Sequence, residues 1–191
     1  MLSDPLLVVA TLAHVFDDLR IRYLVGGSLA SSVYGIPRAT QNVDLVADIR
    51  LPHVEPLTTA LAGQFYVDAE MICEAVKNRA SFNVIHLATM FKADVFIMQG
   101  DAWSNEEMTR ARTEQFEEQG GSIAVRFASP EDTLIHKLVW YKLGNQISER
   151  QWGDILGVLK VQADSLDREY LEKWATVLDV ADLLLRAQQQ R

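Results

Sequence analysis

The chain has 191 residues, of which 49% are hydrophobic and 23% charged, which suits a single domain, or one domain with a helical extension, with a buried core. Its single cysteine, Cys73, excludes an intrachain disulfide and favours a cytoplasmic location, because disulfides are rare in reducing compartments. The formal net charge of −8 argues against a long nucleic acid as partner, since such partners are held by many Lys and Arg contacts. No apolar run reaches about 18 residues, so neither a transmembrane helix nor a membrane partner is expected.

The first segment is apolar but is interrupted by polar residues at helical spacing, and it lacks a basic leader. It is therefore expected to be an amphipathic helix rather than a signal peptide. Alternation, Gly and Pro positions predict the elements that follow. In chain order they are helix 4–19, strand 22–25, helix 28–34, strand 43–47, helix 52–61, helix 69–79, strands 82–87 and 92–98, and strands 113–118 and 122–127.

Local signals mark the ends of several elements. The residues Ser104-Asn105-Glu106-Glu107 form a capping box that predicts the start of a short helix. The pair Gly120-Gly121 predicts a turn between the last two strands.

After Ser129 the pattern is helical throughout. Ser129 at the N-cap and Pro130 at the first helical position predict a helix that ends at Gly144. Ser148 and Asp167 cap two further helices, and a last helix is expected over 180–188. These patterns predict an α/β half over residues 1–128 and a helical C-terminal region over residues 129–191.

Polar groups stand in two strands that are otherwise apolar. Asn42 and Asp44 point to the same face of their strand, roughly 7 Å apart, and Asp94 stands in strand 92–98. An acid inside a buried strand is unfavourable unless it is paired or coordinates a metal. Carboxylates from adjacent strands suit Mg²⁺ that holds a triphosphate, and Gly27-Ser28 at a helix start offers backbone N–H groups to phosphates.

Each of these features also has a purely structural interpretation. A Gly-Gly pair commonly marks only a turn, Asp44 could face water at a strand end, and Asp94 could pair with Arg38 or Lys92. The order of the features along the chain, together with their placement on predicted strands, favours the functional interpretation.

Taken together, Gly27-Ser28, Arg38-x-Thr40, Asn42-x-Asp44 and Asp94 resemble the core of the DNA-polymerase-β-like nucleotidyltransferase superfamily, whose signature is Gly-Ser, then Asp-x-Asp, then a later Asp. The surroundings of Arg38 and Thr40 resemble minimal and abortive-infection-type bacterial nucleotidyltransferases, including toxins of toxin–antitoxin systems. The resemblance continues into residues 129–132, 137–138 and 150–154, and so covers most of the chain.

The resemblance implies a nucleotidyltransferase-like α+β fold, with a mixed β-sheet flanked by helices over residues 1–128 and a C-terminal helical region over residues 129–191 packed on that core. It also implies transfer of NMP from an NTP and a role for each matching residue. Catalysis and binding of Mg²⁺ or Mn²⁺ fall to Asp44, Asp94 and Asn42, with Asp94 also a candidate base. Contacts to the nucleotide fall to Gly27, Ser28, Arg38, Thr40, Lys137 and Asp154. The implied partners are the NTP, an acceptor hydroxyl on a protein, an RNA or a small molecule, and a cognate antitoxin protein.

Asn42 departs from the family pattern, which has Asp there. An amide oxygen can ligate a cation but brings no charge, so metal affinity and transition-state stabilisation should both fall. Asp48 does not substitute for it, because four residues along a strand span roughly 13 Å. Three interpretations stay open: an enzyme with reduced activity, a binding or regulatory module that has lost catalysis, and an engineered Asp→Asn replacement.

Overall fold

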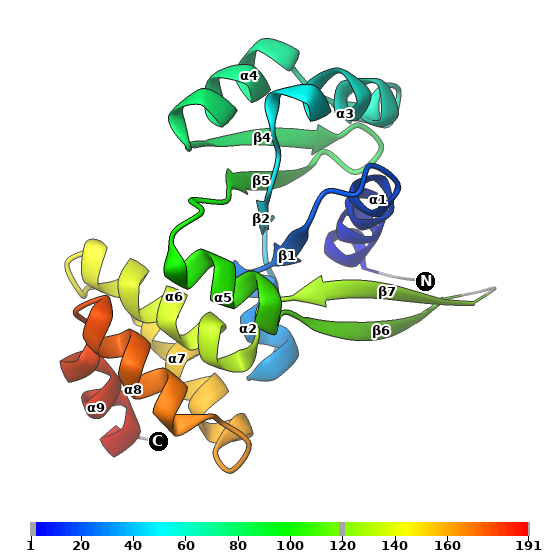
Figure 1. Cartoon of the computed structure of the whole chain (residues 1–191). Coiled ribbons are helices and arrows are strands. Elements are labelled where there is room, and N and C mark those ends of the chain that lie inside the picture. Colours follow the sequence, from blue (N-terminus) through cyan, green and yellow to red (C-terminus); the bar gives the residue numbers. More distant parts are fainter. Residues whose placement is uncertain (1–2, 119–120, 191) are drawn as a thin grey trace. The chain divides into compact units, whose positions relative to one another are not determined.

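The structure is a computed structural model that describes residues 3–118 and 121–190 (Figure 1). The chain forms two compact units, one comprising Met1–Gly26 with Thr40–Phe127 and the other Gly27–Ala39 with Ala128–Arg191. The boundary expected from the sequence, at residue 128, stays a prediction, and the short segment Gly27–Ala39 groups with the C-terminal helices.

The first unit contains every described strand. Its elements are α1 (Asp4–Asp18), β1 (Tyr23–Val25), β2 (Asn42–Ala47), η1 (Leu51–His53), α3 (Val54–Leu61), β3 (Phe65–Tyr66), α4 (Ala69–Asn78), β4 (Ser81–His86), β5 (Phe91–Ile97), α5 (Ala102–Arg110), β6 (Arg112–Glu118) and β7 (Gly121–Phe127). The described strands make a seven-stranded sheet in the order β3-β4-β5-β2-β1-β7-β6. The pairs β2–β5 and β1–β7 are parallel and the other pairs antiparallel, so the predicted α+β fold with a mixed sheet is confirmed.

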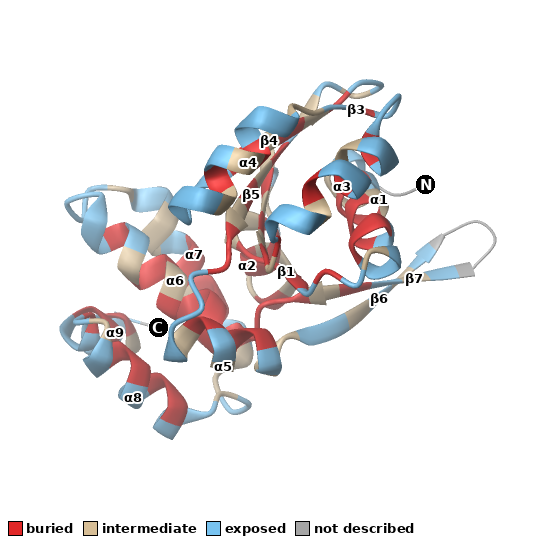
Figure 2. Ribbon diagram, turned by 45° about the horizontal axis from the view of Figure 1, so that its top comes forward, coloured by how far each residue is buried: buried red, intermediate tan, exposed pale blue. Residues whose placement is uncertain are grey.

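Burial alternates along the central strands, as a sheet with one covered face requires. Val43, Leu45 and Ala47 of β2 are fully buried, whereas the alternate positions, which include Asn42 and Asp44, are only partly buried (Figure 2). Helix α1 packs against β1, β2, β5 and β7 and helps to bury this apolar face. The alternate positions of β2 and β5 therefore present the polar side chains together on the other face of the sheet.

Two local predictions in this unit need correction or qualification. Helix α5 begins at Ala102 with Asp101 as its N-cap, because the Asp101 carboxylate accepts from the Ser104 N–H at 2.7 Å. Ser104 therefore lies inside the first turn, and the predicted capping box is wrong. The predicted turn at Gly120-Gly121 includes Gly120, which lies outside the described residues.

The second unit is helical, and its caps are those expected from the sequence. It comprises α2 (Gly27–Tyr34), α6 (Pro130–Leu143), α7 (Glu149–Gln162), α8 (Arg168–Val177) and α9 (Ala181–Gln190). The side chains of Ser129, Ser148 and Asp167 each accept a hydrogen bond from the first turn of the helix that they precede. Among the described residues, no helix combines the length and the apolar character needed to cross a membrane.

Candidate functional site

The two aspartates predicted as metal ligands are direct neighbours in the sheet. Because β2 and β5 run parallel, Asp44 lies opposite Asp94 in the register, and Asn42 lies opposite Lys92. All four side chains belong to the face of the sheet that alternates with the buried Val43 and Leu45 positions. The structure thus brings Asn42, Asp44 and Asp94 together within the first unit.

Asn42 occupies the centre of this cluster as a hydrogen-bond donor. Its Nδ2 donates to Asp94 Oδ2 at 2.8 Å and to Asp44 Oδ1 at 3.3 Å. An ionised carboxylate can only accept, so the amide presents nitrogen rather than oxygen to the two acids. The amide thereby offsets part of the repulsion between two neighbouring carboxylates.

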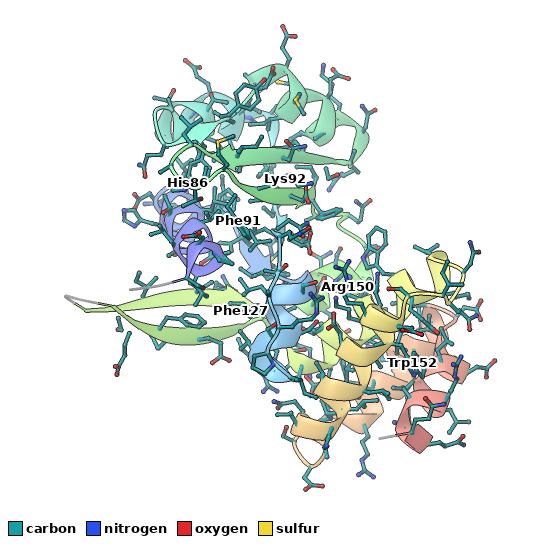
Figure 3. The ribbon with its side chains drawn as sticks, turned by 180° about the vertical axis from the view of Figure 1, so that it is seen from behind. His86, Phe91, Lys92, Phe127, Arg150 and Trp152 are labelled. Carbon is teal, nitrogen blue, oxygen red and sulfur yellow. The ribbon has the colours of Figure 1, made fainter. Side chains whose placement is uncertain are left out.

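Lys92 supplies the positive charge of the cluster. Its Nζ lies 3.0 Å from Asp94 Oδ2, and it stands at the start of β5, where it is labelled in Figure 3. The structural interpretation of Asp94 as a partner of Lys92 is therefore borne out, whereas Arg38 pairs elsewhere. The register also places Asn83 of β4 opposite Asp94. The sequence alone did not identify Asn83 as a site residue, because no local motif includes it.

The donor set fits a hard divalent cation in kind but falls short in charge. Two carboxylates and one amide are oxygen ligands of the type that Mg²⁺ prefers. Within residues 3–118 and 121–190, no group of three or more His, Cys, Asp or Glu side chains is gathered as a metal site. An aspartate at position 42 would complete such a group, so the shortfall traces to Asn42.

A second cluster lies wholly within the helical unit. Arg38 forms a two-point ion pair with Asp154, with Nε to Oδ1 at 2.7 Å and Nη2 to Oδ2 at 2.8 Å. Lys137 Nζ reaches the same Asp154 Oδ2 at 2.8 Å, and Arg38 Nη2 also donates to Ser28 Oγ at 2.6 Å. Four of the residues predicted to contact the nucleotide are thus joined in one network.

The side chains of this network are largely buried, so their charges interact more strongly than they would in water. Asp154 is 5% exposed and Lys137 9% exposed at the side chain, against 25% for Arg38. Burial alone raises the pKa of Asp154, but the hydrogen bonds from Arg38 and Lys137 outweigh it and hold that pKa below its ordinary value of 3.8. Asp154 is therefore ionised near neutrality, and the network carries one net positive charge.

Gly27 and Thr40 have local backbone roles. Gly27 opens α2 with φ of 59°, a left-handed conformation that favours glycine. Thr40 Oγ1 donates to the Asn42 carbonyl at 2.8 Å and so anchors the start of β2. Both residues are placed beside a cluster in their own unit, and their contact with a nucleotide stays a prediction.

Comparison with known proteins shows that the fold of this chain is similar to that of several solved structures. No protein-family model matches the chain, and no curated protein sequence matches it. Among solved structures, an antigenic nucleotidyltransferase-like protein from Paracoccidioides brasiliensis is 20% identical with a TM-score of 0.53, covering 98% of this chain and 93% of its own.

The antibiotic-resistance factor ANT(2'')-Ia is similar in two further structures. In its solution structure it is 16% identical with a TM-score of 0.52, covering 97% of this chain and 96% of its own. In complex with adenylyl-2''-tobramycin it is 15% identical with a TM-score of 0.53, covering 91% and 95%. The chain therefore has the nucleotidyltransferase-like fold that the resemblance implies. The narrower resemblance to abortive-infection-type proteins stays a prediction.

Proposed function

We propose that this protein binds an NTP with Mg²⁺ or Mn²⁺ and transfers its NMP group to an acceptor hydroxyl. The observation that carries the proposal is the register of β2 and β5, which sets Asp44 directly beside Asp94 with Asn42 between them. Two neighbouring carboxylates repel each other, and a divalent cation bound to both would offset that repulsion. The nucleotidyltransferase-like fold supports the same chemistry.

The residues divide the work of transfer as follows. The acceptor oxygen forms a bond to the α-phosphorus, the bond from that phosphorus to the pyrophosphate oxygen breaks, and pyrophosphate leaves. Asp94 accepts the proton of the acceptor hydroxyl, for which Lys92 must release its carboxylate. When bound to Asp44, Asp94 and the Asn42 amide oxygen, a divalent cation would supply charge neutralisation at the phosphates.

The second cluster is proposed to bind triphosphate through its cations. Lys137 and Arg38 carry the charge, and Asp154 orients both side chains through its two oxygens. Asp154 itself is a positioning residue, because a carboxylate repels phosphate oxygens. Ser28 and the N–H groups at the start of α2 complete the proposed phosphate contacts.

The acceptor is proposed to be a small molecule in preference to a long RNA. The net charge of −8 disfavours the many phosphate contacts that RNA requires. ANT(2'')-Ia, which has been solved with adenylyl-2''-tobramycin, offers a small-molecule precedent on the same fold. A protein acceptor, as in a toxin neutralised by a cognate antitoxin, is the alternative, and growth arrest on expression that a co-expressed neighbouring gene relieves would favour it.

The decisive experiment offers each labelled NTP with Mg²⁺ or Mn²⁺ and follows label transfer and pyrophosphate release. We expect slow transfer by the unmodified chain, a gain in Asn42→Asp, and loss in Asp44→Asn and Asp94→Asn. Asp18→Asn is the matched control, because Asp18 is an exposed carboxylate outside the cluster. If calorimetry detects no binding of the metal–NTP complex to either the unmodified chain or Asn42→Asp, the proposal fails.

A second candidate function is a nucleotidyltransferase-like module that binds or regulates without turnover. It is favoured by the hydrogen bonds from Asn42 and the Lys92 ion pair, which satisfy both carboxylates without any metal. Binding of NTP without pyrophosphate release, unchanged by Mn²⁺, would support this reading. Robust transfer by the unmodified chain would exclude it.

A further inference from the structure

A cavity of about 270 Å³ lies in the first unit, away from the carboxylate cluster. It is formed where β2 and β5 end, whereas Asn42 and Asp44 stand in the first half of β2 and Asp94 at the middle of β5. Asp44 and Asp48 are four positions apart, so the two places are separated by roughly 13 Å along β2. Nothing proposed above uses this cavity.

Three arginines line the cavity, and only one carboxylate lines it with them. The charges of Arg22, Arg50 and Arg79 together with that of Asp48 give the cavity a net charge of about +2, in a chain whose net charge is −8. Arg22 Nη2 and Arg50 Nη2 both donate to Asp48 Oδ2, at 2.8 Å and 3.1 Å. Two guanidiniums are thus held side by side by one shared acid.

Arg79, the C-cap residue of α4, completes the set. Its Nη1 donates to the Met98 carbonyl, at 2.5 Å, which anchors the guanidinium across the end of β5. Gly100 lies beside this guanidinium and has φ of 79°, a left-handed backbone conformation that favours glycine. Each guanidinium has five N–H donors, and the hydrogen bonds described here occupy only part of each set.

Most of the other residues in the wall are apolar, apart from the polar Asn105. Ile49, Val76 and Ile97 line the cavity together with Met98. Ile49, Ile97 and Met98 are buried, so the floor is a fixed part of the core. A ligand matched to this cavity therefore joins a doubly negative group to a compact apolar body.

We propose that this cavity is a second binding site, for a small organic phosphate monoester. Such a phosphate carries about −1.5 to −2 charges at pH 7, which matches the net charge of the cavity better than one carboxylate does. Arginine forks bind phosphate through paired N–H groups, and the apolar wall receives the organic part. The site is independent of the proposed NMP transfer.

Phenyl phosphate is the probe, titrated into the ¹⁵N-labelled full chain and followed by amide chemical shifts, with inorganic phosphate and benzoate in parallel. We expect saturable shifts at Ile49, Gly100 and Asn105, with phenyl phosphate bound most tightly of the three. Arg79→Asn should weaken binding about tenfold or more, since one charged hydrogen-bonding group is lost. Asparagine also tolerates the left-handed backbone of Arg79, whose φ is 50°, so the fold is kept.

Lys77→Gln is the matched control, because Lys77 lies on the same helix and pairs with Glu74 outside the cavity. It should leave the affinity for phenyl phosphate unchanged within about twofold, since its charge lies outside the cavity. Equal weakening in both variants would mean a general charge effect and would overturn the site. So would shifts confined to Ser28, Arg38 and Lys137, or no saturable shift at Gly100. Asp44→Asn should not affect this titration, so failure here and failure of the proposed NMP transfer can be told apart.

Discussion

The side chain of Asn42 acts as a substitute for a cation in the carboxylate cluster. Its Nδ2 donates to both Asp44 and Asp94, at 3.3 Å and 2.8 Å. To ligate a metal, the same amide must turn its oxygen inward and give up both hydrogen bonds. We therefore expect the unmodified chain to bind divalent cations weakly, because position 42 lacks a charge and because both hydrogen bonds must break.

Replacing Asn42 with Asp should make the fold depend on metal. Without metal we expect Asn42→Asp to lose about 1–3 kcal/mol, because the hydrogen bonds to two ionised acids are replaced by repulsion. With Mg²⁺ at 100 times its dissociation constant, about 2.7 kcal/mol should return. Thermal unfolding with and without Mg²⁺ measures both effects. Asn145→Asp adds the same charge at an exposed position of the helical unit and should show no Mg²⁺ dependence.

Asp154 is the residue on which the second cluster depends. Asp154→Asn leaves Lys137, 9% exposed, without a counter-charge, and we expect a loss of about 3 kcal/mol at pH 7. Asp164→Asn, at an exposed position of the same unit, should stay within about 0.5 kcal/mol of the unmodified chain. Urea unfolding of the three proteins gives the comparison, and equal stability of Asp154→Asn would contradict the ion-pair network.

The same comparison has a defined pH dependence. The pKa of Asp154 is lowered in the folded state, so its contribution is fully present above the unfolded value of 3.8. It is lost as the pH falls through the lower folded-state pKa, where the carboxylate is protonated. The difference in unfolding free energy between the unmodified chain and Asp154→Asn should therefore be constant from pH 7 to about 5 and shrink below 3.8. A difference that grows on acidification would contradict this assignment.

At the scale of elements, the contact between α2 and α7 depends on Gly35. A Cβ at this position would lie 2.8 Å from the Ser31 carbonyl oxygen and 2.9 Å from the Val158 backbone nitrogen. Both are backbone atoms that cannot move aside alone, so Gly35→Ala should cost about 1–3 kcal/mol. Gly153 in α7 has no atom within 4 Å of such a Cβ, and Gly153→Ala should instead gain about 0.5–1 kcal/mol. Chemical denaturation distinguishes the two signs.

The elements were largely predictable because their signals are local. Alternation in β2 and β5, and the caps Ser129, Ser148 and Asp167, lie within a few residues of what they determine. Strand β3 has only two residues, Phe65–Tyr66, too few for any period to be read. At α5, a Ser-x-x-Glu pattern matched a capping box, but Asp101 three residues earlier took the cap. Asp101 and Ser104 are both good N-cap residues, so the local sequence does not decide at which of them the helix begins.

Contacts between distant segments were not predictable in the same way. The alignment of Asp44 with Asp94 follows from the parallel register of β2 and β5, which no local pattern in either strand specifies. The Arg38–Asp154 pair joins residues 116 positions apart, and the three arginines of the cavity come from three separate segments. The family resemblance identified Asp44, Asp94, Arg38 and Asp154 as candidate site residues, but it did not specify these contacts. The arginine cavity has no such signature and emerges only from the folded chain.

At the scale of the whole molecule, the acidic charge confines binding of anions to a few places. With 26 acidic residues against 18 Lys and Arg, the general field repels polyanions, while Lys137, Arg38 and the arginine cavity attract small ones locally. A small anion needs only one such place, whereas a long nucleic acid needs many in a row. The charge distribution therefore discriminates by ligand length as well as by sign.

This distinction predicts weak binding to RNA. A fluorescein-labelled single-stranded RNA of about 20 nucleotides should bind with a dissociation constant above about 100 µM at physiological salt, at the weak end of non-specific binding. Fluorescence anisotropy without divalent cations measures it apart from any turnover, and a basic RNA-binding domain serves as positive control. Micromolar binding that weakens steeply between 50 and 200 mM salt would reveal a continuous cationic track. In that case RNA would replace a small molecule as the preferred acceptor, because such binding requires more cationic contacts to phosphate than Lys137, Arg38 and the arginine cavity supply.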